Sequence, residues 1–261
     1  MEFFDSHAHY DDEKFENDRD EVISSVKAEG ITRLVSVGYN IKSSKFAQEL
    51  SSKYEFIYHS CGISPNDIPQ SEEEWWKELK EISLIVQEKH KKLVAIGEIG
   101  LDYYWNKENS KLQKLAFIEQ IKLANEYNLP IIIHTREAVA DTLDILKNKQ
   151  PALNNGIFHC CPLNRELVKE ALKLGYYISF AGPITFKNSK NASEIIDMVP
   201  LDKILIETDS PYLSPEPNRG KRNDSRNVKY MAQKISEVKQ IPLEEIAKIT
   251  YENANRVFKI K

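Results

Sequence analysis

The chain has 261 residues and a net charge of −4, with 41% hydrophobic and 29% charged residues. This composition is typical of a globular protein, and a chain of this length can bury a large core without disulfide bonds. Because the charge is negative, the surface as a whole does not attract nucleic acid, and any polyanion site must be a local basic patch.

The cysteines and the N-terminus indicate where the protein works. Only three cysteines occur, and the adjacent Cys160 and Cys161 lack the CxxC spacing of common zinc or redox sites. No basic segment followed by an apolar one opens the sequence, and no apolar run is long enough to span a membrane. We therefore expect a cytoplasmic protein that contacts no membrane, and we infer no stable protein partner from the sequence.

Short β-branched runs alternate with amphipathic, charged stretches along the chain. The runs predict strands at Phe3–His7, Thr32–Gly38, Phe56–Gly62, Leu93–Gly100, Pro130–His134, Gly156–Cys160, Tyr176–Ala181 and Lys203–Asp209. The stretches between and after them predict helices, among them Asp18–Glu29, Glu72–Lys91, Ser110–Tyr127, Ala138–Lys147, Arg165–Leu174, Asn227–Lys239 and Leu243–Phe258.

This alternation predicts an α/β fold, a (β/α)8 TIM barrel, as a single domain over residues 1–261. An open, doubly wound sheet is the alternative. No GxGxxG or GxxxxGK[ST] motif follows the first predicted strand, which argues against the nucleotide-binding versions of that alternative.

Metal-ligand residue types gather at the ends of the predicted strands, where TIM barrels carry their active sites. Four of the six histidines lie there. The complete set is His7, His9, Glu98, His134, His159, Glu207 and Asp209. A histidine at any one of these positions could equally be a hydrogen-bonded core residue, but the set together predicts a metal centre.

The spacing of these residues gives each a candidate role. His7 and His9 point the same way because strand side chains alternate, so both could hold one cation. Glu98 could bridge two metals with its two oxygens, the alternative being a buried salt bridge. His134 and His159 would complete a second site with Glu98. Asp209 could be a ligand or a helix N-cap.

One acidic residue is expected behind the ligands rather than among them. Glu207 lies two residues before Asp209, on the same side of the predicted strand. From there it could orient a ligand or a water molecule.

These residues stand in blocks that resemble the TatD family of metal-dependent deoxyribonucleases, within the amidohydrolase-like barrels. The blocks are DSHAHY at 5–10, GEIGLDYY at 97–104, HTR at 134–136, HC at 159–160, SFAGPITFKN at 179–188, ETDSPYLSPEPNRGKRN at 207–223 and ENANRVF at 252–258. The resemblance implies a TIM barrel with two divalent metal ions, whose identity (Zn, Mg or Mn) stays open. It places His7, His9, Glu98 and Asp209 at the first metal and Glu98, His134 and His159 at the second.

The chain departs from the family pattern at two places. Ser64 stands where many relatives carry the histidine of a Gly-x-His-Pro motif, and His59, five residues earlier, is better interpreted as a core residue. After His159 the usual aromatic-Ser-Gly is replaced by Cys161-Pro162-Leu163. Neither departure removes a predicted ligand, but both bear on substrate preference.

The expected reaction is hydrolysis of DNA phosphodiester bonds by a metal-activated water, with an exonuclease-like action. Divalent metals neutralise phosphate charge and lower the pKa of bound water. Asp209 and Glu98 are the predicted catalytic residues, with Asp209 as a possible proton acceptor. The predicted phosphate contacts are Arg136, Lys187, Arg219, Lys221 and Arg222, although such a basic run could also be a solvated loop.

Three aromatic residues and two alternative functions remain open. Tyr103, Tyr104 and Trp105 could stack on bases or could pack their own loop. The first alternative function is a metal-dependent hydrolase of small phosphoesters, esters or amides. The second is a non-catalytic barrel that binds metal or nucleic acid, suggested by Ser64.

Overall fold

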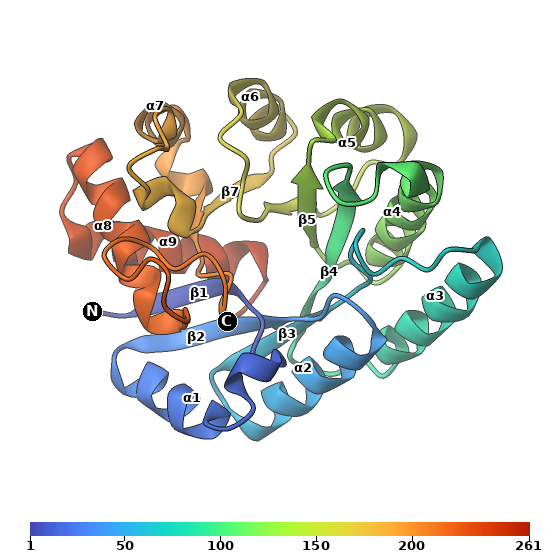
Figure 1. Ribbon diagram of the computed structural model, residues 1–261, viewed down its shortest axis with the longest axis horizontal. Helices are drawn as coiled ribbons and strands as arrows, with labels where there is room; N and C mark the ends of the chain where they lie inside the picture. The colour runs from blue at the N-terminus through green and yellow to red at the C-terminus, as the bar shows by residue number, and fades with distance from the viewer.

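Eight parallel strands form one sheet in chain order, β1 to β8, in the computed structural model, which describes residues 1–261. The strands are β1 (Phe3–Ala8), β2 (Ile31–Val37), β3 (Ile57–Cys61), β4 (Leu93–Asp102), β5 (Ile131–Arg136), β6 (Gly156–Phe158), β7 (Tyr177–Phe180) and β8 (Ile204–Ile206). Figure 1 shows the helices succeeding one another around these strands. This arrangement confirms the predicted (β/α)8 TIM barrel.

Nine α-helices lie outside the strands. They are α1 (Arg19–Ala28), α2 (Ile41–Lys53), α3 (Glu72–Gln87), α4 (Ser110–Glu126), α5 (Val139–Asp144), α6 (Arg165–Lys173), α7 (Ala192–Met198), α8 (Val228–Lys239) and α9 (Leu243–Val257). The sequence pattern singled out neither α2 nor α7. Helix α2 is rich in serine and begins with a capping box at Asn40 and Ser43, which supplies the start signal that its weak apolar pattern lacks.

Strand ends differ from the predicted ends where the backbone turns sharply. Strand β8 ends at Ile206 and Asp209 has φ 57°, a left-handed conformation that aspartate tolerates better than most residues. Strand β6 ends at Phe158, and Cys160 has φ 36°. Strand β4 instead runs on to Asp102, two residues past its predicted end.

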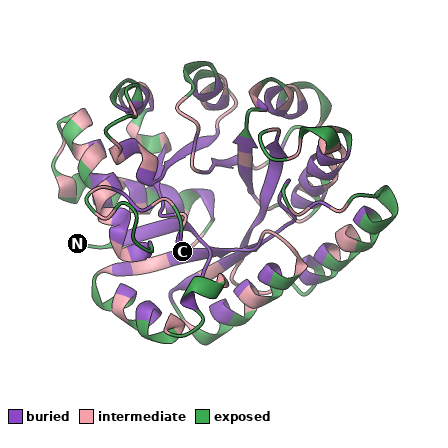
Figure 2. Cartoon of the chain, in the orientation of Figure 1, coloured by how far each residue is buried: buried purple, intermediate pink, exposed green.

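Alternating side chains divide the core into two clusters on the two faces of the sheet. Ile131 and Ile133 belong to the large cluster that packs against the helices, whereas Ile132 between them belongs to a smaller one. The smaller cluster unites strand residues from around the barrel with Ala254 and Val257 of α9 and with Phe258, which follows the helix. It fills the barrel interior, so the strands are buried on both faces while the outer faces of the helices are exposed (Figure 2).

The seam between β1 and β8 is held mainly by side chains. The only ladder contact is an isolated bridge between Ala8 and Ser210. The buried Asp5 carboxylate accepts hydrogen bonds from the Thr208 backbone N–H (2.9 Å) and the Thr208 hydroxyl (2.6 Å). Beside it the Asp209 N–H donates to the His7 carbonyl (2.9 Å). The seam therefore fixes the end of β1 against the residues that follow β8.

The length and hydropathy of the helices decide whether any of them could cross a membrane. None of the nine combines the length and the apolar character needed to span a bilayer.

Candidate metal centre

The six predicted ligands converge at the C-terminal end of the barrel, with Glu98 between two groups of them. Glu98 Oε2 lies 3.4 Å from His7 Nε2 and 3.8 Å from His9 Nε2. Glu98 Oε1 lies 2.9 Å from His134 Nδ1 and 3.5 Å from His159 Nε2. Each oxygen thus faces its own pair of histidines, the arrangement expected of a carboxylate shared by two cations.

The first group comes from the β1–β8 seam. The Nε2 atoms of His7 and His9 lie only 3.1 Å apart, and Asp209 Oδ1 lies 3.6 Å from the first and 3.3 Å from the second. His7 is fully buried and His9 nearly so. The same strand geometry that was expected from the HxH spacing therefore brings both imidazoles to one carboxylate.

The second group comes from β5 and the end of β6. His134 Nδ1 and His159 Nε2 lie 3.3 Å apart. His134 lies on the same side of β5 as the interior residue Ile132, two positions earlier, which aims it into the barrel. The rings of His7 and His159 stack with centroids 4.0 Å apart, so the two groups are in direct contact.

Three of the four histidines have a fixed partner on the nitrogen that points away from the cluster. His134 Nε2 lies 2.9 Å from Asp102 Oδ2, His159 Nδ1 lies 3.3 Å from Glu207 Oε1, and His9 Nδ1 lies 3.2 Å from the Val37 carbonyl. Such partners set the tautomer and ring orientation of a metal-ligating histidine. Glu207 therefore lies where the sequence predicted it, behind the ligands, and it also accepts a 2.6 Å hydrogen bond from Cys160 N–H.

Asp102 is the functional candidate that sequence reasoning missed. It is fully buried at the end of β4, four residues beyond Glu98 and on the same side of the strand. The signal was present in the spacing, but the strand was predicted to end at Gly100, which left Asp102 in a loop.

The carboxylates and histidines at this centre shift one another's pKa values toward the charged forms. Burial alone would raise the pKa of Glu98, but His159, His134 and His7 hold it well below its usual value. Burial also opposes the ionised form of Asp209, yet His9 and His7 lower its pKa to about 2. Conversely, Asp209 and Glu98 overcome the burial of His9 and raise its pKa to about 9. Cations are strongly favoured here.

The donor set also matches what a divalent cation requires. Three groups of three donors, drawn from the six predicted ligands, each have all their atoms within 4.8 Å of one another. Imidazole nitrogens with carboxylate oxygens suit zinc and other transition metals, and added carboxylates extend the choice to Mn²⁺ and Mg²⁺. This cluster is therefore able to bind metal.

The departures from the family pattern lie beside the centre. Ser64 is buried, and its hydroxyl donates to Asp67 Oδ2 (2.9 Å). Cys161 is buried as well. His59 is fully buried in β3, with Nδ1 2.8 Å from the Ser51 hydroxyl, which confirms its interpretation as a core residue.

The predicted phosphate contacts differ in whether an acidic residue of the protein already pairs with them. Four of them are exposed: Arg136 is the last residue of β5, and Lys187, Arg219 and Lys221 lie in the segments that follow β7 and β8. Arg222 instead makes a bidentate ion pair with Asp18, at 2.8 Å and 2.6 Å, and also donates to the Lys14 carbonyl. Its charge is neutralised within the protein, so the geometry favours a structural role for Arg222.

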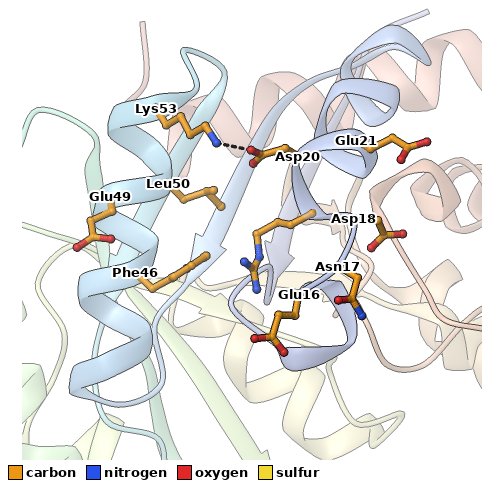
Figure 3. Close-up of a pocket in the computed structure, with 10 residues that line it drawn as sticks. Glu16, Asn17, Asp18, Asp20, Glu21, Phe46, Glu49, Leu50 and Lys53 are labelled. Carbon is orange, nitrogen blue, oxygen red and sulfur yellow. Dashed lines mark hydrogen bonds and ion pairs between the residues drawn. The ribbon is translucent and has the colours of Figure 1, made fainter.

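Asp18 also lines a surface hollow of about 430 Å³ between α1 and α2 (Figure 3). Asp20 and Lys53 form an ion pair across it, and Glu16, Glu21 and Glu49 lie around its rim. None of the six predicted metal ligands contributes to this hollow. We therefore assign the chemistry to the barrel mouth.

Sequence comparison decides the family. The family model described as TatD related DNase matches residues 4–259. The chain belongs to this family. It is 46% identical over 98% of its length to a protein from Bacillus subtilis (strain 168) named "Uncharacterized metal-dependent hydrolase YabD", covering 99% of that protein. It is 35% identical over its whole length to "Uncharacterized metal-dependent hydrolase YcfH" from Escherichia coli (strain K12), covering 97% of it.

Structural comparison supports the same assignment at the level of the fold. The crystal structure of YJJV, a TatD homologue from Escherichia coli K12, superimposes with a TM-score of 0.92, with 24% identity, over 99% of this chain and 98% of the other. The TatD-family resemblance inferred from the sequence is confirmed, and with it the assignment as an enzyme of the metal-dependent hydrolase class.

Proposed function

We propose that this TatD-family hydrolase is a metal-dependent deoxyribonuclease that cleaves DNA phosphodiester bonds in an exonuclease-like manner. The observation that carries the proposal is the position of Glu98, whose two oxygens face two separate sets of donors. Two-metal sites occur in nucleases, polymerases and phosphatases, where the ions stabilise the attacking and leaving oxygens of an in-line displacement.

The residues divide between two cations. His7, His9 and Asp209 would hold one, His134 and His159 the other, and Glu98 both. When bound, divalent ions neutralise phosphate charge and lower the pKa of coordinated water. Asp209, a carboxylate beside His7 and His9, is the proposed proton acceptor.

The carboxylates behind the histidines keep the donor atoms aimed inward. With Asp102 accepting from His134 Nε2–H, the lone pair of Nδ1 faces the centre. Glu207 Oε1, 3.3 Å from His159 Nδ1, attracts that side of the ring electrostatically, which keeps Nε2 toward the centre. These two residues act by positioning the ligands, without touching the substrate.

Substrate binding is assigned to the exposed cations at the mouth. Arg136, Lys187, Arg219 and Lys221 would contact the phosphates that flank the scissile one. Because the protein carries a net charge of −4, binding depends on these local groups and weakens as salt increases.

A nuclease assay tests the proposal directly. Purified protein is incubated with end-labelled single- and double-stranded DNA, first with EDTA and then with Mg²⁺, Mn²⁺ or Zn²⁺ restored. We expect stepwise shortening from one end that EDTA abolishes and one of the ions restores. Unaltered DNA under every metal condition would overturn the proposal.

One observation favours a second candidate, a hydrolase of small phosphoesters, esters or amides. Where the family pattern has a histidine, the Ser64 hydroxyl is hydrogen-bonded to Asp67, so this wall of the mouth presents a carboxylate rather than a cation. A panel of small phosphoesters, carboxylic esters and amides, assayed beside the DNA, would distinguish the two. Faster metal-dependent turnover of a panel member than of DNA would support this candidate.

A further inference from the structure

Exposed aromatic side chains concentrate at the barrel mouth. Four aromatic residues are exposed, and three of them, Tyr104, Trp105 and Tyr212, follow strands β4 and β8. The fourth, Trp76, lies on α3. Trp105 is 67% exposed, the highest value among the four. An indole left this open keeps an accessible face, although its ring also contacts Tyr104 of the same loop.

Trp105 is tied to the metal centre through one carboxylate. Asp102 Oδ1 accepts hydrogen bonds from the backbone N–H groups of Tyr104 (2.9 Å) and Trp105 (3.1 Å). The other oxygen, Oδ2, holds the ligand candidate His134. The Gln113 side chain holds both ends of the same turn, because it accepts a hydrogen bond from the Asp102 N–H and donates one to the Asn106 carbonyl. The aromatic turn therefore keeps a fixed position relative to the predicted ligands.

The side chain of Arg136 packs against the two aromatic rings of this turn. Arg136, two residues after His134 on β5, places its guanidinium carbon 3.8 Å from the centre of the Tyr104 ring and 5.6 Å from that of Trp105. The two rings meet edge to face, with centroids 4.8 Å apart. Arg136 and Tyr104 support one another, and the indole beside them remains open.

We propose that Trp105, backed by Tyr104 and Arg136, is a stacking platform for an unpaired nucleobase of a single-stranded nucleic acid. The proposal rests on the proposed function for its ligand class. An indole face accepts any flat base, and a guanidinium beside it attracts the adjacent phosphate. A base that is still paired within a duplex cannot lie on this surface, so the platform selects single-stranded or frayed ends.

Binding measurements test the platform independently of cleavage. The probes are two fluorescein-labelled single-stranded oligonucleotides with cleavage-resistant phosphorothioate linkages, one bearing all its bases and one with abasic residues at its end. Metal-loaded wild type is expected to bind the complete probe about tenfold more tightly than the abasic probe by anisotropy. Trp105→Ala is expected to lose this preference, and Trp105→Phe to retain most of it.

Tryptophan fluorescence supplies a second readout and a matched control. In a Trp76→Phe background, Trp105 is the only exposed tryptophan, because Trp75 is fully buried. The complete probe is expected to quench its emission and the abasic probe to leave it unchanged. Trp76→Ala, which removes an exposed tryptophan on α3, is expected to bind both probes as the wild type does.

The outcomes separate the platform from the nuclease proposal. Equal binding of the two probes by the wild type, or an unchanged preference in Trp105→Ala, would overturn the platform even if the protein cleaves DNA. A preference that Trp105→Ala abolishes would support the platform even if the nuclease assay finds no cleavage, in which case only the proposed hydrolysis of DNA fails.

Discussion

The six histidines form two regions with opposite electrostatic character. His7, His9, His134 and His159 surround carboxylates at the barrel mouth, whereas His59 and His90 form a separate pair with ring centroids 5.0 Å apart. Burial, followed by His90 and Lys92, lowers the pKa of His59 to about 3. At the mouth, Asp209 and Glu98 override the burial of His9 and raise its pKa to about 9.

This difference shows that neighbours, rather than burial, decide what a histidine does here. His9 and His59 are both buried. His9 faces two carboxylates, so a positive charge beside it is stabilised. The His59 ring has only the Ser51 hydroxyl as a hydrogen-bond partner, and the neighbours that act on its pKa, His90 and Lys92, both lower it. The first environment favours a bound cation and the second disfavours even a proton.

The largest expected effect comes from removing the charge that the mouth histidines share. Glu98→Gln keeps the shape of the side chain but loses the carboxylate that faces both groups. We expect kcat/KM on the preferred substrate to fall by more than about 100-fold, equivalent to about 2.7 kcal/mol of transition-state stabilisation. Metal content after dialysis, measured by atomic spectroscopy, is expected to fall with it.

The control for this variant is Glu126→Gln, the same chemical change at an exposed position at the end of α4. It is expected to match the wild type in both measurements. Full activity and full metal content in Glu98→Gln would contradict the role of this carboxylate at the centre.

A smaller effect is expected from a carboxylate that touches only one histidine. Asp102→Asn replaces an oxygen facing His134 Nε2 by an amide. If the amide nitrogen faces the ring, the proton must move to Nδ1, the atom that faces Glu98. We expect metal affinity at this half of the centre to fall about 10- to 100-fold, the range seen for partners of metal-ligating histidines. Isothermal titration of metal into the apoprotein measures this.

Asp144→Asn at the end of α5 supplies the comparison for that titration, because Asp144 pairs with Lys149 away from the mouth. If Asp102→Asn and Asp144→Asn bind metal equally well, Asp102 does not position His134.

The sequence predicted the fold, and it predicted that the candidate ligands lie together, because both leave local signals. His134 was expected at the mouth because it ends a predicted strand, and strand alternation in the HxH spacing predicted that His7 and His9 lie together, as they do. Those rules act within one strand. The position of Glu98 between two pairs of histidines depends on four different strands, so the sequence offered it only as one of two alternatives, beside a buried salt bridge, and the closed barrel supplies its geometry.

Features that depend on contacts between segments far apart in the chain were not predicted from the sequence. The charge of Arg222 was assigned to substrate, but Asp18, far away in the chain, neutralises it. Asp102 was missed because β4 continues past its predicted end. At the seam between β1 and β8, Asp5 is hydrogen-bonded to Thr208, 203 positions away in the chain. No pattern in either segment predicts this contact.

The last prediction concerns the histidine pair that lies outside the centre. Unfolding returns His59 to an ordinary pKa near 6.5, whereas in the folded protein its pKa is lowered to about 3. Between these values the unfolded state binds one more proton than the folded state. The stability that this histidine contributes is therefore fully present above pH 6.5 and is lost as pH falls, at about 1.4 kcal/mol per pH unit.

His59→Asn removes this titration while offering an amide N–H to Ser51, whose own hydroxyl donates to the Gln48 carbonyl. The free energy of unfolding in urea, measured at several pH values from about 6 to about 4, is expected to fall less steeply in the variant by about 1.4 kcal/mol per pH unit. The comparison uses slopes because any cavity left by the smaller side chain shifts stability equally at each pH. Parallel slopes in wild type and variant would show that His59 accepts a proton in the folded state as readily as in the unfolded one, and the contrast between the two histidine regions would then not hold.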